Sequence, residues 1–77
     1  MDYPRRTTVL KKLRQLIYTN EENPDIFSPK SWGKATGLCN FYIENNCLTK
    51  KQVSMLEEIH IKITKICAEY GIKIEDY

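Results

Sequence analysis

The sequence lacks the runs and residues from which several classes of protein are built. No stretch approaches the roughly 20 consecutive apolar residues that span a membrane, and the opening MDYPRRTT has no apolar core of the secretory type. The three glycines match neither nucleotide-binding fingerprint. The single histidine, His60, lies in an apolar stripe, where a core or boundary role is commoner than that of a base. We therefore expect a cytoplasmic, non-enzymatic protein without a membrane segment.

Cysteine is also scarce, and its spacing argues against a metal site. Cys39, Cys47 and Cys67 form an odd set in a chain without a secretion signal, which indicates free thiols in a reducing compartment. No C-x-x-C or H-x-x-x-H pair occurs, so the cysteines and His60 lack zinc-ligand spacing. We expect no metal and no other cofactor, and we expect two of the thiols to be packed in a core.

What is present is an ordinary globular composition with an uneven charge. Seventy-seven residues are enough for one domain, which we place at residues 1–77. Apolar residues make up 42% and charged residues 29%, so a folded chain is expected rather than a disordered one. The net charge is only +2, yet basic residues gather in the first twenty positions and acidic ones at 21–25. This layout favours weak or assisted nucleic-acid binding over strong non-specific binding.

Apolar periodicity predicts three long helices and no strand. Apolar residues recur with helical spacing over 7–18, 28–46 and 50–70. Ser28 followed by Pro29 is typical of a helix start, with serine as the cap and proline at the first helical position. A further short helical turn is expected from Pro24. Each long helix has one apolar face, so the chain is predicted to be all-α, a small bundle of three to four helices.

The strongest local signals flank the third helix. Thr49 and Gln52 have the spacing of a capping box, and Leu48 and Val53 that of a hydrophobic staple. At the other end, Gly71 suits the left-handed residue that follows a helix, with the chain folding back behind it.

The second helix is predicted to bury one stripe and to expose its opposite side. Leu38 flanks that stripe and Phe41 lies opposite it, so Phe41 is expected to be exposed, as is Ile61 of the third helix. The stripe consists of Trp32, Ala35, Thr36, Cys39, Tyr42 and Ile43. Trp32 stands between two lysines, so its indole either packs in the core or stacks on a base.

Two lysines in the first turn of the third helix are the most informative charged residues. Lys50 and Lys51 follow the cap, where cations are mildly unfavourable because a helix start carries partial positive charge. Either they are solvated surface, or they complete with the free N–H groups a site for a phosphate. Other cations are predicted to add backbone contacts: Lys11, Lys12, Arg14 and Lys34.

The segment from Trp32 to about Ile66 resembles a known family. Trp32, Leu38, Phe41–Tyr42 and the run CLTKKQVSMLEEIHIKI are similar to the short helical accessory proteins of the T4-type phage UvsW DNA helicase. Those resemble the helicase-and-RNase-D C-terminal module of RecQ helicases. The resemblance implies a four-helix bundle that binds structured nucleic acid, and it carries over Lys50 and Lys51.

Together these observations lead to two expectations about function. The first is a non-catalytic, monomeric module that assists a DNA helicase in phage recombination, repair or replication. It would bind branched or single-stranded DNA weakly in the host cytoplasm, while the ATP site belongs to the partner. The alternative is a helical adaptor or inhibitor that docks on a protein and does not touch nucleic acid. Salt dependence separates the two, because phosphate binding weakens as salt rises.

Overall fold

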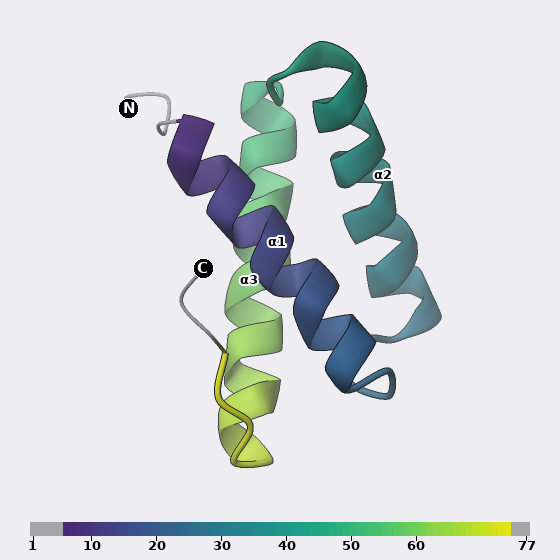
Figure 1. Cartoon of the computed structure of the whole chain (residues 1–77), viewed down its shortest axis with the longest axis vertical. Coiled ribbons are helices and arrows are strands. Elements are labelled where there is room, and N and C mark those ends of the chain that lie inside the picture. Colours follow the sequence, from purple (N-terminus) through teal and green to yellow (C-terminus); the bar gives the residue numbers. More distant parts are fainter. Residues whose placement is uncertain (1–5, 75–77) are drawn as a thin grey trace.

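The computed structural model describes residues 6–74, with side chains from Thr8 onward, and these residues form a bundle of three helices (Figure 1). The helices are α1 (Arg6–Glu22), α2 (Pro29–Asn45) and α3 (Lys50–Glu69). The all-α prediction is confirmed. Between α1 and α2 the chain makes a turn, in which the N–H of Ile26 donates to the carbonyl of Asn23 at 3.1 Å. The described residues contain no fourth helix there, because this turn does not propagate before Pro29 begins α2.

The three helices run in alternating directions. Short connections make α2 antiparallel to both neighbours, so α1 and α3 start at the same end of the bundle, the upper end in Figure 1. From this end α1 runs down and crosses over the middle part of α3, and each pair of helices is in contact. The end of α2 and the starts of α1 and α3 therefore share one pole of the molecule.

Local side-chain chemistry defines where α2 and α3 begin. At α2 the hydroxyl of Ser28 accepts a hydrogen bond from the N–H of Ser31 at 3.2 Å, and Pro29 occupies the first helical position. At α3 the capping box is complete. The hydroxyl of Thr49 accepts from the N–H of Gln52 at 3.2 Å, and the Gln52 side chain accepts from the N–H of Thr49 at 2.9 Å.

Left-handed residues end the same two helices. Asn46 has φ 60°, and its N–H donates to the carbonyl of Tyr42 at 2.7 Å. After α3, Gly71 has φ 69°, and the N–H of Ile72 donates to the carbonyl of Cys67 at 2.8 Å. This reversal was predicted from Gly71, and it returns the chain so that Ile72 and Ile74 pack against the core.

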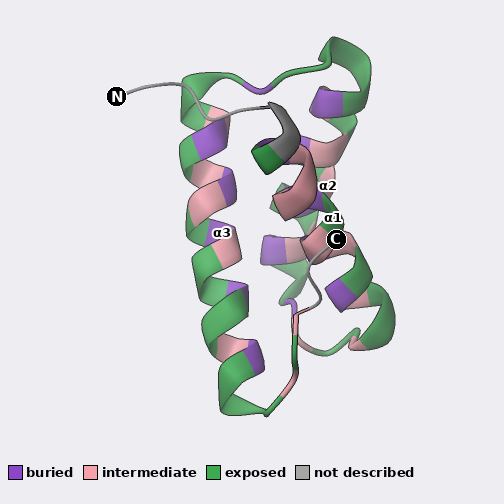
Figure 2. Ribbon diagram, turned by 60° about the vertical axis from the view of Figure 1, so that its left-hand side comes forward, coloured by how far each residue is buried: buried purple, intermediate pink, exposed green. Residues whose placement is uncertain are grey.

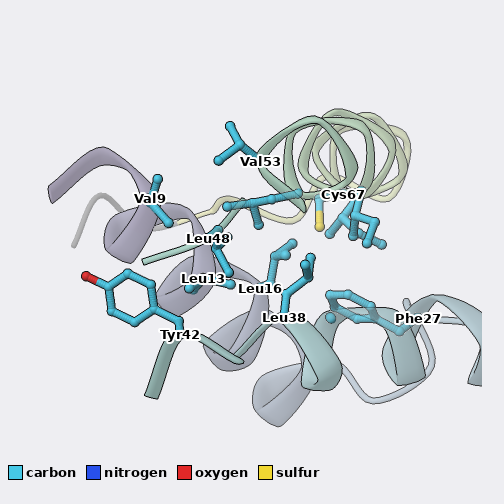
Figure 3. Packing of buried hydrophobic residues seen from close by; sticks show 13 residues of the cluster. Val9, Leu13, Leu16, Phe27, Leu38, Tyr42, Leu48, Val53 and Cys67 are labelled. Atoms are coloured by element: carbon cyan, nitrogen blue, oxygen red, sulfur yellow. The ribbon is translucent and has the colours of Figure 1, made fainter. Parts of the chain in front are cut away.

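A single hydrophobic core joins the three helices. Figure 2 shows that buried positions recur along the side of α3 that faces the other helices, and Figure 3 shows Leu13, Leu16 and Leu38 projecting into the shared interior. Leu48 and Val53, the predicted staple, are both buried in it. The buried apolar residues are Val9, Leu13, Leu16, Phe27, Ala35, Leu38, Tyr42, Leu48, Val53, Leu56, Ile59, Ile63 and Cys67.

The buried face of α2 differs from the predicted stripe. Its centre runs through Ala35, Leu38 and Tyr42, so Leu38 is central rather than flanking. Phe41 was predicted to be exposed, but it is half-buried and packs against the core. Ile43 was placed on the buried side, but it is 77% exposed. Both predictions fail for one reason: α2 contacts α1 and α3 at once, which rotates its buried arc toward Phe41 and away from Ile43.

Trp32 takes a position between its two predicted alternatives. It is half-buried, and its ring meets the buried Phe27 edge-on, with centroids 5.3 Å apart at 70°. Such edge-to-face pairs are favourable beyond the area they bury. Trp32 thus closes the lower end of the core over the α1–α2 connection.

Candidate nucleic-acid interface

The first turn of α3 keeps two backbone donors that its own cap does not use. Four N–H groups at a helix start have no partner within the helix. The capping box satisfies those of Thr49 and Gln52. The N–H groups of Lys50 and Lys51 are the remaining two, and they belong to the first turn of the helix, where the helix dipole favours an anion.

The side chains of the same two lysines are exposed and available. Within residues 8–74, neither ammonium group forms an ion pair or a hydrogen bond. Consecutive residues of a helix point about 100° apart. The side chains of Lys50 and Lys51 therefore lie on two different sides of α3, on either side of the first turn that carries the two N–H groups.

Lys50 lies on the flank of α3 that α1 covers. It precedes Val53 and Glu57 by three and seven residues, which places the three on one side of the helix. Val53 and Glu57 line a shallow crevice together with Thr8 and Lys12 of α1. The crossing of α1 over α3 thus brings Lys12 beside Glu57, seven residues or about 10 Å along α3 from Lys50, and the Glu57 carboxylate lowers the positive potential there.

The predicted cations of α1 divide between two sides of that helix. Lys11 and Arg14 are three residues apart and so are neighbours on its outer side, where Arg14 is exposed and Lys11 half-buried. Lys12 is half-buried on the flank next to α3. One turn further along, His60 Nε2 and Gln15 Oε1 are 2.7 Å apart across the α1–α3 contact. Burial, and secondly the Lys12 ammonium, lower the pKa of His60.

Lys34 stands apart from the others. It is exposed in the second turn of α2, eleven residues before the helix ends. At 1.5 Å per residue this is about 16 Å along the helix from the connection that leads to α3. One phosphate cannot contact both Lys34 and Lys50, so Lys34 belongs to a different part of the surface.

Sequence reasoning missed one aromatic residue beside these cations. Tyr18 follows Lys11 by seven residues and Arg14 by four, which puts it on the outer side of α1, where it is 40% exposed. Cations next to an exposed aromatic ring are the usual elements of a surface on which single-stranded bases stack. The spacing is visible in the sequence, but Tyr18 is the last residue of the predicted first helix, 7–18, and the sequence alone does not show how far its ring is exposed.

The thiols differ in exposure. Cys67 is buried and Cys39 half-buried, and burial raises the pKa of each. Cys47 is exposed in the connection between α2 and α3. Over the described residues, no three His, Cys, Asp or Glu side chains gather in a geometry that could hold a metal ion.

Comparisons with known proteins add no relative. No family model matches the chain, and no curated protein or solved structure matches it significantly. Across residues 6–74, no helix has the length and apolar character required to cross a membrane.

Proposed function

We propose that the chain is a non-catalytic, monomeric helical module that binds structured or single-stranded DNA weakly through backbone phosphates. The observation that carries this proposal is the start of α3. Two exposed ammonium groups and two unused N–H donors, all from Lys50 and Lys51, surround one turn of helix. Helix starts of this kind are recurrent phosphate contacts in DNA-binding proteins.

The cations of α1 extend this site over the surface. Lys12 lies on the same flank of α3 as Lys50, about two helical turns further along, and Lys11 and Arg14 lie on the outer side of α1. A strand that leaves the α3 start in this direction meets further cations and then the ring of Tyr18. These contacts neutralise phosphates and offer one stacking platform, and none of them reads a base edge.

The few cations involved make the binding weak and dependent on salt. If about three phosphates are neutralised on a single strand, the logarithm of the binding constant falls with the logarithm of salt with a slope of about −2. Affinity useful at physiological salt then requires a second binding partner on the same DNA. The resemblance of residues Trp32 to Ile66 to helicase-associated modules supports a DNA helicase as that partner, with the ATP site on the helicase.

A titration with DNA tests the proposal directly. A forked oligonucleotide and a single strand are added to the isotope-labelled protein, and the amide resonances of residues 48–53 are followed by NMR. We expect these resonances and those of the outer side of α1 to shift at low salt and to return toward their free positions as salt rises.

Two matched double variants separate a specific site from general attraction. Lys50→Gln with Lys51→Gln removes two charges from the proposed site. Lys62→Gln with Lys65→Gln removes two charges from exposed positions further along α3. The first pair is expected to weaken binding about tenfold and to reduce the salt slope, whereas the second leaves the site intact. If the two double variants weaken DNA binding equally, Lys50 and Lys51 are not part of a specific interface.

Two exposed apolar residues favour the adaptor as a second candidate. Ile43 is 77% exposed on α2 and Ile61 is 67% exposed on α3. An adaptor that docks on a protein through such residues would bind with little dependence on salt and would not respond to DNA. Unchanged amide resonances at the highest oligonucleotide concentration, at low salt, would favour this function.

A further inference from the structure

A groove lies at the pole of the molecule opposite the start of α3. Its one wall is the end of α1 and the turn that follows it, from Glu22 to Ile26, and its other wall is Tyr70 and Ile72. In Figure 1 both segments are at the lower end of the bundle. The groove has a volume of about 460 Å³, within the size range of protein ligand sites, and it is open to solvent.

The turn after α3 builds this groove. The left-handed Gly71 reverses the chain, and the N–H of Ile72 is fixed to the carbonyl of Cys67. This leaves the Tyr70 side chain 71% exposed beside the mouth, while Ile26 and Ile72 are half-buried at the base. The groove therefore has an apolar floor and an aromatic edge that none of the described residues covers.

The charged residues of the lining are of one sign. Glu22 and Asp25 stand exposed at the rim, and none of the cationic side chains that the structure describes lines the groove. Lys73, although it follows Ile72, does not contribute to it. An exposed tyrosine ring next to two carboxylates attracts a guanidinium or ammonium group, by cation–π contact and by ion pairing.

We propose that this groove docks a basic segment of a partner protein, in which an arginine or lysine is adjacent to an apolar residue. The cation would lie between Tyr70 and the carboxylates of Glu22 and Asp25, and the apolar residue would contact Ile26 and Ile72. A nucleic-acid strand is repelled by this rim. The groove and the cationic start of α3 are at opposite poles, so the chain binds a protein at one end and leaves the other end accessible to DNA.

A short peptide is the probe for this groove. A capped peptide of alternating arginine and leucine is titrated into the full-length labelled protein, with a glutamate–leucine peptide as the matched control. We expect the arginine peptide alone to shift the amide resonances of Ile26 and Ile72. Absence of these shifts at millimolar peptide would overturn the proposal.

Charge-matched variants decide whether the groove itself is the site. Glu22→Gln with Asp25→Asn should weaken peptide binding about fivefold, in line with the loss of two exposed ion pairs. Glu44→Gln with Glu58→Gln removes the same charge from exposed positions of α2 and α3 and should change the affinity less than twofold. Equal weakening by the two pairs refutes the groove in favour of non-specific attraction.

Self-association is the remaining outcome to be separated. Sedimentation of the unliganded protein shows whether a second copy occupies the groove. A concentration-dependent dimer that Tyr70→Ala abolishes would overturn docking of a partner segment. None of these measurements uses DNA. A negative result for the peptide therefore says nothing about the proposed phosphate site, and a negative result in the DNA titration says nothing about the groove.

Discussion

Replacing Thr49 by alanine should remove one half of the capping box and destabilise the whole bundle by about 1 kcal/mol, because the N–H of Gln52 then loses its side-chain acceptor. The bundle has one core, so the loss is felt by the entire molecule rather than by α3 alone. The entropy of unfolding is about 2.1 cal/mol/K per residue, or about 0.16 kcal/mol/K for this chain. A change of about 1 kcal/mol therefore lowers Tm by about 6 °C.

Thermal unfolding followed by far-UV circular dichroism measures this shift. Thr49→Ser keeps the acceptor oxygen and should stay within about 2 °C of the unmodified protein. Ser54→Ala removes a hydroxyl from an exposed position inside α3 and should leave Tm unchanged or slightly raised, since alanine favours a helix interior. If Thr49→Ala lowers Tm no more than Ser54→Ala does, the cap does not stabilise the bundle and the reasoning is wrong.

The other predictions concern stability at single positions. Ile63→Ala should lower the free energy of unfolding by about 3 kcal/mol, because Ile63 is only 1% exposed. Ile61 is 67% exposed, so Ile61→Ala should lower it by less than about 0.5 kcal/mol. Urea denaturation measures both values, and similar losses would contradict the core assignment. Gly71→Ala should destabilise the protein by about 1 kcal/mol, because Gly71 has φ 69°. Gly37→Ala should stabilise the protein by up to about 1 kcal/mol, because the added methyl group meets open space on α2. The opposite order of stabilities would refute the left-handed turn. The pKa of His60 is lowered in the folded protein, so the unfolded chain binds this proton more readily. The free energy of unfolding should therefore fall as pH drops from about 7 toward 5. His60→Gln should flatten this part of the pH profile, and an unchanged profile would show that His60 does not cause the fall.

The helix boundaries were predictable because the signals for them are local. Ser28 with Pro29, and Thr49 with Gln52, act within a few residues of chain, and the structure places both caps where the sequence predicted them. Gly71 is the same kind of signal. Each can be recognised without knowing what the helix packs against.

The orientation of α2 was not predictable in the same way. A periodic pattern shows that a helix has an apolar side, but the buried arc depends on the positions of both neighbours. Phe41 and Ile43 were consequently assigned to the wrong sides. The groove escaped sequence reasoning for a related reason, since Ile26 and Ile72 meet there only through the tertiary fold.

Among the candidate cations, sequence reasoning gave the residues but not their grouping. Lys50 and Lys51 follow directly from the cap, and the structure leaves them exposed. That Lys12 lies on the same flank of α3 as Lys50, and that Lys34 is remote from Lys50, depends on how α1 crosses α3 and on which way α2 runs. These are long-range relations, and no short motif encodes them.

The unequal exposure of the three thiols has a practical consequence for labelling. A thiol must ionise and meet the reagent before it can be alkylated, and Cys39 and Cys67 are disfavoured on both counts. A maleimide dye should therefore attach to Cys47 in the unmodified protein, without any engineered cysteine. That dye would sit three residues before Lys50, so its fluorescence can report on whatever approaches the α3 start, in real time and at nanomolar protein.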